Sequence, residues 1–143
     1  MQKTIAVYIK ALHRRFDQFC DRRLQEMGLT KGLLYVVLYV GNHPGCGPGE
    51  LAEALDFDAG HATRSMEKLV KAGLVAKERS REDRRAVCLR LTEAGREAFE
   101  ASRWLFQEWD ETAAAELTEE ERTELIRLLG KMTGEKGRNG HDL

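Results

Sequence analysis

The stretch RSREDRRAVCLRLTEAG, residues 79–95, decides the fold of this chain. Four arginines fall within residues 79–85, and apolar and polar side chains then alternate from Val87 to Leu91. Alternation with a period of two is typical of a half-buried strand, and the preceding LVAKER also has strand character. The stretch therefore predicts a β-hairpin with a cationic tip, followed by a helix that Thr92 can cap.

Two short helices are predicted directly before the hairpin. Pro48 suits the first position of a helix, because its missing amide hydrogen is not needed there. Asp58 can cap the next helix, AGHATRSMEKLVKAG, and Gly73 can end it. Only residues 56–58 join the two helices, which is the layout of a helix-turn-helix. A helix-turn-helix followed by a hairpin is a winged helix, so the arginines lie on its wing.

Longer helices are predicted on both sides of the winged helix. Residues 4–27 carry apolar side chains at steps of three and four, and residues 31–42 are apolar almost all round. An acidic helix begins at Thr92, and Thr118 with Glu121 forms a capping box for a last amphipathic helix.

The fold class is therefore mainly α with a small β-hairpin wing. The apolar stripes of the first and last helices exceed what a lone chain of 143 residues can cover, so we expect a second copy to pack on them. We expect a winged helix-turn-helix domain over residues 30–92, and a helical dimerisation region over 1–29 and 93–135. Residues 136–143, which are polar and rich in glycine, are expected to be a flexible tail.

Charge is distributed unevenly along the chain, although the net charge is only −1. Residues 59–91 sum to +5 and residues 92–124 to −8. This asymmetry indicates an electrostatic footprint confined to the winged helix. No apolar run approaches the ~20 residues that span a bilayer, and the first 19 residues lack the apolar block of a signal peptide. We expect a cytoplasmic protein with no membrane partner.

Three features of the sequence occur together. They are the stretch GELAEALDFDAGHATRSMEKLVKAGLV (residues 49–75), the wing pattern EDRRAVCLRLTEAG (82–95), and the order of the outer helices. In these features the chain resembles the MarR family of bacterial winged helix-turn-helix transcription regulators, whose wing shows Asp-Arg-Arg, a strand and Leu-Thr-x-x-Gly.

The resemblance implies a homodimer that binds double-stranded DNA at a roughly palindromic promoter operator. We expect a repressor that a small-molecule effector releases. Small hydroxyl residues are usual in the family where this chain has Gly60 and His61, so the base preference stays open.

The second helix of the helix-turn-helix is expected to enter the major groove. Small Ala59 and Gly60 would let the backbone approach the duplex. His61 and Arg64 can reach base edges or phosphates, and Thr63 can contact a phosphate or a thymine methyl group. The full predicted set on this helix is Ala59, Gly60, His61, Thr63, Arg64 and Lys68.

The wing tip is expected to reach the flanking minor groove, where negative potential attracts arginine. By resemblance, Arg85 is the inserted side chain, with Asp83 paired to it or to a nearby arginine. Arg81 and Arg84 would meet phosphates, assisted by Arg79. A merely solvated turn is the alternative, but four arginines against two acids disfavour it.

Regulators of this type often respond to a small molecule bound between the dimer helices and the winged helix. An aromatic acid or phenol would suit a pocket lined by aromatic side chains and an imidazole. The candidate lining residues are His13, Phe16, Tyr35, Tyr39 and Trp104. Each of them could equally pack in the core without touching a ligand.

A thiol switch is the alternative trigger, and it would make the protein a redox-responsive regulator of the same fold. Cys20 lies on the apolar face of the first helix, where burial makes a thiol inert. Cys46 lies in a loop and could be exposed, and Cys88 lies on the outer face of the wing. Three widely spaced cysteines without a C-x-x-C pair do not indicate a disulfide scaffold.

A winged helix used for protein docking is a further alternative. A docking surface would show apolar groups at the wing, and its affinity would not fall steeply with salt. No Gly-rich phosphate loop, H-E-x-x-H or nucleophile elbow occurs, so we predict no enzymatic activity and no cofactor. His43 with Cys46 offers two ligands, which are too few for a metal site.

Overall fold

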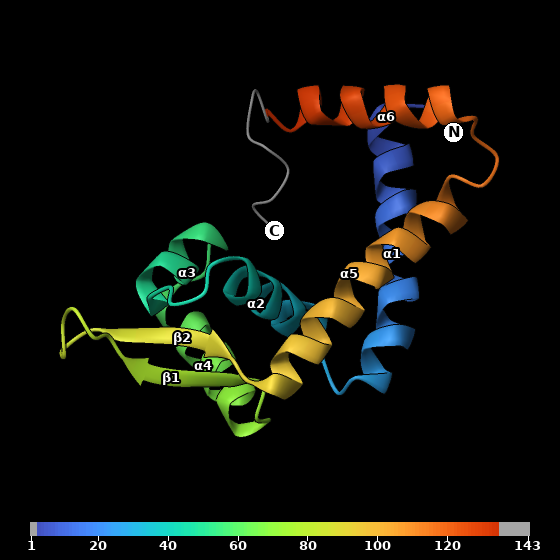
Figure 1. Ribbon diagram of the computed structural model, residues 1–143. Helices are drawn as coiled ribbons and strands as arrows, with labels where there is room; N and C mark the ends of the chain where they lie inside the picture. Colours follow the sequence, from blue (N-terminus) through green and yellow to red (C-terminus); the bar gives the residue numbers. More distant parts are fainter. Residues whose placement is uncertain (1–2, 135–143) are drawn as a thin grey trace.

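The structure, a computed structural model, describes residues 3–134, which form six helices and two strands (Figure 1). In chain order they are α1 (Ile5–Glu26), α2 (Lys31–Asn42), α3 (Pro48–Ala54), α4 (Ala59–Lys71), β1 (Val75–Arg79), β2 (Val87–Leu91), α5 (Glu93–Ala113) and α6 (Glu119–Met132). The tail predicted over residues 136–143 lies outside the described residues. No helix within residues 3–134 has the length and apolar character that crossing a membrane requires.

The elements gather into two groups (Figure 1). Helices α2, α3 and α4 and the hairpin form one end of the molecule, while α1 and α6 lie at the other, and α5 runs from one group to the other. The core lies mainly in the first group, because α2 is apolar on nearly every side. Its largest fully buried side chains include Leu34, Val37, Leu51, Leu69 and Leu89.

The predicted helix starts are confirmed, since each capping side chain accepts a hydrogen bond from the first turn. Thr30 caps α2, Asp58 caps α4 and Thr92 caps α5. At α6, Thr118 and Glu121 make both bonds of the capping box. Such caps satisfy amide hydrogens that have no partner inside the helix.

The hairpin gains a third strand-like contact from the loop before α3. Strands β1 and β2 pair antiparallel, with Val75 opposite Leu91 and Arg79 opposite Val87. Cys46 forms a bridge to Leu89: the Leu89 amide donates to the Cys46 carbonyl at 2.8 Å, and the neighbouring Gly45 amide donates to the Leu89 carbonyl at 2.9 Å. This pairing corrects the expectation of an exposed Cys46, because the bridge leaves only 4% of the residue accessible.

The connection between the wing and α5 is one residue long. Thr92 donates its backbone N–H to the Leu74 carbonyl (3.1 Å) and its hydroxyl to the Gly73 carbonyl (2.5 Å). Its Oγ1 accepts from the Gly95 amide at 3.0 Å. A Cβ at position 95 would lie 1.9 Å from the Leu74 carbonyl oxygen, so only glycine allows this approach. The Leu-Thr-x-x-Gly pattern is therefore the joint between hairpin and helix.

Helix α1 is tied to the winged helix and to α5 by polar and aromatic contacts. Lys31, at the start of α2, hydrogen-bonds to Asp17 of α1, and Arg23 pairs with Glu108 of α5 at 2.9 Å. The ring of Phe16 lies 5.4 Å from that of Trp109, edge to face. These contacts fix the direction of α1 relative to the winged helix.

Helix α6 has no buried residue. Its apolar side chains remain open to solvent, and so do those on the N-terminal half of α1. The exposed apolar residues of these two helices are Ile5, Tyr8, Ile9, Leu12, Leu125, Ile126, Leu128, Leu129 and Met132. We call this set the α1/α6 apolar face.

Candidate nucleic-acid interface

The turn between α3 and α4 sets the position of the predicted recognition helix. The Phe57 amide donates to the Ala52 carbonyl at 2.8 Å, which folds the turn back on α3. Asp56 takes a left-handed conformation, with φ of 54°. Aspartate tolerates this region better than most residues, so a glycine is not needed there.

Helix α4 has one buried and one exposed side. Ala62, Ser65, Met66 and Leu69 are buried against the core. The six predicted DNA-contacting residues of this helix are all exposed: Ala59, Gly60, His61, Thr63, Arg64 and Lys68. The structure thus brings them together on one accessible surface.

The first turn of α4 holds Arg64 close to the helix start. A Cβ at position 60 would lie 3.0 Å from Arg64 Nη1 and 3.4 Å from Asp58 Oδ1, so Gly60 makes room for the guanidinium. The His61 amide donates to Asp58 Oδ1 at 2.7 Å. This hydrogen bond, aided by the nearby charge of Arg64, lowers the pKa of the Asp58 carboxyl group.

His61 is stacked on Phe57, which lies just before the capping residue. The two ring centroids are 4.0 Å apart and the planes differ by 16°. Phe57 is half-buried and packs against the hydrophobic core, whereas His61 is exposed. Sequence analysis missed this pair. The only sequence signal for the stack is that Phe57 and His61 are four residues apart, on either side of the residue that caps α4.

The wing tip is shaped by bonds to its own backbone. Ser80 Oγ accepts from the Glu82 amide at 3.3 Å, and Asp83 Oδ1 accepts from the Arg85 amide at 3.0 Å. Asp83 is predicted to pair with Arg85 or a nearby arginine. Its carboxylate reaches Arg85 through the backbone amide and so caps the turn.

The guanidinium groups at the tip make no ion pair among residues 3–134, and the residues that carry them are exposed. They belong to Arg79, Arg81, Arg84 and Arg85. At the base of the wing, by contrast, Arg90 Nε contacts Glu78 Oε2 at 3.2 Å across the hairpin. Glu78 is therefore paired at the base of the wing, whereas the tip has four arginines against Glu82 and Asp83 and keeps a net positive charge.

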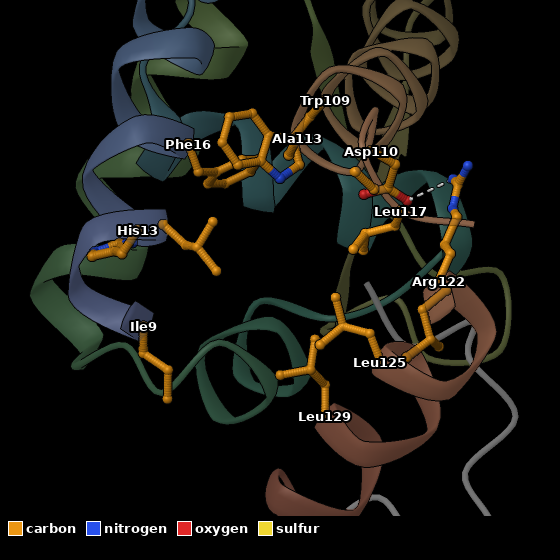
Figure 2. A pocket seen from close by; sticks show the side chains of 13 residues that line it. Ile9, His13, Phe16, Trp109, Asp110, Ala113, Leu117, Arg122, Leu125 and Leu129 are labelled. Atoms are coloured by element: carbon orange, nitrogen blue, oxygen red, sulfur yellow. Dashed lines mark hydrogen bonds and ion pairs between the residues drawn. The ribbon is translucent and has the colours of Figure 1, made fainter. Parts of the chain in front are cut away.

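The five residues predicted to line an effector pocket do not converge within the described chain. His13 and Phe16 line a groove of about 380 Å³ between α1, α5 and α6 (Figure 2). Tyr35 and Tyr39 lie on α2, outside this groove, and Tyr39 stacks on His43. Trp104 is 63% exposed on another side of α5.

Trp109 lines the groove instead of Trp104. In Figure 2, Phe16 of α1 approaches Trp109 of α5, while Leu125 and Leu129 project from α6. Asp110 and Arg122 form an ion pair at 3.5 Å beside them. The inward stripe of α5 contains positions 98, 102, 105 and 109, and this period could have identified Trp109 from the sequence.

Two of the three thiols are buried. Burial raises the pKa of both Cys20 and Cys46 to about 11, so these thiols stay protonated near neutral pH. The thiolate is the reactive form of cysteine, so neither residue has the character of a redox sensor. Cys88 is half-buried on β2.

Comparisons with known proteins show the family of the chain. The sequence model of the MarR family matches residues 27–86, from the end of α1 to the wing tip. Over 132 residues, 92% of either chain, this chain is 42% identical to the HTH-type transcriptional regulator BilQ of Clostridium symbiosum (strain WAL-14163). The chain belongs to the MarR family. It is therefore a winged helix-turn-helix, DNA-binding transcriptional regulator of that family, as predicted.

Two further comparisons agree. A putative transcriptional regulatory protein for the hcr operon of Thauera aromatica is 31% identical over 82% of this chain and 70% of its own. The solved structure of the reduced form of MarR from E. coli is similar with a TM-score of 0.81 and 26% identity, covering 92% of this chain and 98% of that one. The predicted fold class is confirmed.

Proposed function

We propose that this MarR-family regulator is a homodimeric repressor that acts in the cytoplasm at a roughly palindromic promoter site. A small aromatic effector releases it. The observation that carries the DNA-binding part is the exposed set on α4 and the wing, whose tip guanidiniums have no ion-pair partner among residues 3–134. Such groups can neutralise phosphates without first breaking a contact in the free protein.

The roles of the α4 residues follow from their surroundings. Ala59 and Gly60 have small side chains, which let the backbone of α4 come close to the bases in the major groove. His61 and Arg64 reach base edges or phosphates in the same groove. The Thr63 hydroxyl already donates to the Ala59 carbonyl at 2.8 Å, which favours a thymine methyl contact over a phosphate. Lys68, further along the helix, would meet a phosphate.

One wing residue is proposed to contact bases, and three others are proposed to contact phosphates. Arg85 enters the minor groove, and its backbone direction is set by the bond to Asp83. Arg79, Arg81 and Arg84 bind phosphates on either side. The acidic α5 begins at the base of the hairpin and runs away from the wing tip, and α6 lies at the other end of the molecule (Figure 1).

The α1/α6 apolar face supports the dimer. A short helix without buried side chains is marginal in water, because most helical stability in proteins comes from packing of an apolar face. We infer that the α1/α6 apolar face of a second copy covers α6. Two winged helices would then lie side by side and bind the two halves of the operator.

The effector part of the proposal rests on the groove of Figure 2. Its volume of about 380 Å³ is in the range of small-ligand sites. The aromatic rings of Phe16 and Trp109 suit a planar ligand, and His13 and Arg122 could meet an acidic group. The second copy would close the open side of the groove, so that the ligand and the dimer contact share one surface.

Selection of bound duplexes from a random DNA pool tests the function directly. We expect a palindromic consensus, and affinity for it that falls steeply between 50 and 200 mM salt, by ~10³ for six or more phosphate contacts. Recovery of no enriched sequence, with affinity insensitive to salt, would instead support a winged helix used for protein docking.

A release assay on the selected duplex separates the two triggers. Small aromatic acids and phenols are expected to dissociate the complex, whereas hydrogen peroxide is not, because two of the three thiols are buried and protonated. Release by peroxide, reversed by a thiol reductant and lost in Cys88→Ser, would establish the redox alternative.

A further inference from the structure

The start of α4 holds a pair of rings that the family resemblance does not explain. Gly60 and His61 lie in the first turn of α4. The imidazole of His61 lies flat on the ring of Phe57, at 4.0 Å between centroids and 16° between planes. The two residues thus have separate structural roles: Gly60 leaves room for Arg64, and His61 stacks on Phe57.

The stack restrains a side chain that would otherwise move freely. An exposed side chain loses rotamer entropy when it binds, and prior restraint removes part of that loss. The Phe57 ring lies against the imidazole, and the Asp58 carboxylate accepts from the His61 backbone amide, which fixes only the backbone from which the side chain extends. Phe57 in turn packs against the core, so the position of the imidazole is set by the body of the domain.

The edge of the imidazole is available for recognition. Neither ring nitrogen of His61 has a hydrogen-bond partner within residues 3–134, and the residue is exposed at the start of α4. A face-on stack covers one side of a ring and leaves its nitrogens at the rim. A ring held in this way can present an N–H to a base edge that offers acceptors, as guanine does with N7 and O6.

We propose that Phe57 is a positioning residue for operator recognition, which holds the His61 imidazole so that it reads one base pair in each half-site. This inference rests on the proposed DNA-binding mode of α4. Phe57 itself touches no DNA. Its effect is on base preference, through His61, and not on general affinity for duplex.

The test compares base preference in variants of the full chain. The probe is the duplex that the wild-type protein selects from a random pool, together with every single base-pair substitution of it. Binding is measured for wild type, His61→Ala, Phe57→Leu, Phe57→Tyr and the double variant Phe57→Leu/His61→Ala. Leucine keeps apolar packing but removes the stack, and tyrosine keeps both. Thermal unfolding of each variant checks that the domain is folded.

His61→Ala is expected to lose at least ~5-fold discrimination at one position of each half-site. Phe57→Leu should lose discrimination at that same position, Phe57→Tyr should retain it, and the double variant should match His61→Ala alone. Affinity for unrelated duplex should stay within about twofold, because phosphate contacts are unchanged.

Three outcomes overturn the inference: a wild-type preference profile in Phe57→Leu, a loss at different positions from His61→Ala, or an equal weakening for all sequences. If wild-type protein selects no duplex, the proposed function fails and this inference fails with it. If it selects one that His61→Ala binds with unchanged preference, only the present inference fails.

Discussion

Arg85 lies at the exposed end of the wing, with its backbone amide bound to Asp83 Oδ1 at 3.0 Å. Its guanidinium group has no ion-pair partner within residues 3–134. Arg90, at the base of the same hairpin, is paired with Glu78. The guanidinium group of Arg85 is therefore available to DNA, whereas that of Arg90 is already paired. The difference comes from the position of Glu78 at the base of the hairpin.

Replacement of Arg85 with alanine is expected to lower affinity for the selected operator severalfold or more, and to reduce the salt dependence by the equivalent of about one phosphate contact. Fluorescence anisotropy over a salt series measures both. Arg103→Ala on α5, which removes an arginine paired with Glu100, is the matched control and should bind normally. Equal effects of the two variants would refute the assignment of Arg85.

The close approach of Gly95 to the Leu74 carbonyl can be tested by adding a single methyl group. In Gly95→Ala the new methyl group meets the Leu74 carbonyl oxygen at 1.9 Å, so the joint must shift. We expect a loss of about 2 kcal/mol in the free energy of unfolding, typical of overpacking. Gly49→Ala, where a Cβ meets nothing within 4 Å, is the control in the same denaturant titration. A cost no greater than that of the control would show that the contact relaxes freely.

Single residues also show how far sequence reasoning reaches. The caps at Asp58, Thr92 and Thr118 were predicted correctly, because capping depends on residues three positions apart. The burial of Cys46 was not, because it comes from pairing with a strand more than 40 residues later. The Phe57–His61 stack was missed for a similar reason. It depends on the turn that Asp56 makes, and hydrophobic periodicity carries no information on turns.

Helices α1 and α2 are connected through the Asp17 carboxylate. Lys31 donates a hydrogen bond to Asp17, and His13 Nδ1 lies 3.6 Å from it. The hydrogen bond from Lys31 is the main cause that lowers the pKa of Asp17, and the nearby charges of His13 and Lys31 act in the same direction. This contact joins the predicted dimerisation region to the winged helix, because Lys31 is the first residue of α2.

A lowered pKa means that the folded state favours the ionised carboxylate. The contribution of Asp17 to stability is therefore fully present above the unfolded pKa of about 4, and is lost as pH falls through the lower folded value. We expect Asp17→Asn to unfold at lower denaturant at pH 7, and to lose less stability than wild type on acidification below pH ~4. Glu26→Gln, at the other end of α1, is the control. Identical acid profiles of wild type and Asp17→Asn would contradict this account.

The positions of the helices along the chain can be predicted from the sequence more readily than the contacts between the helices. The order of six helices and a hairpin follows from periodicity and capping signals that lie close together in the sequence. The period of α5 already places Trp109 on its inner side, but the contact of that side with Phe16 of α1 depends on tertiary packing. The division into dimerisation and DNA-binding regions stays a prediction that the single chain does not test.

The whole molecule has a positive end and an apolar end. The wing tip and the outer side of α4 form the first, and the α1/α6 apolar face forms the second. We propose that DNA covers the positive end and that a second copy of the chain covers the apolar end. Dimer formation and operator binding are linked if both winged helices must bind a palindromic site at once. Loss of the dimer then weakens operator binding although every DNA-contacting residue is unchanged.

Leu129→Glu on α6 tests this link. A carboxylate placed within an apolar interface must be desolvated, so the dimer dissociation constant is expected to rise at least ~10-fold. Sedimentation velocity measures the dimer, and anisotropy measures operator affinity, which should fall with it. Thr123→Glu on the same helix adds the same charge outside the α1/α6 apolar face and should leave both unchanged. A dimer that tolerates Leu129→Glu would place the interface elsewhere.

The single residue between β2 and α5 has a consequence for the choice of promoter. With Thr92 bonded to Gly73, Leu74 and Gly95, the hairpin cannot swing independently of the long helix that follows it. In a pair of such chains, the separation of the two hairpins would be fixed by the crossing angle of the two long helices. Because the double helix repeats every ~10.5 base pairs, five extra base pairs at the centre of the site would turn one half to the opposite side. The protein would then be sensitive to rotational phase as well as to base identity.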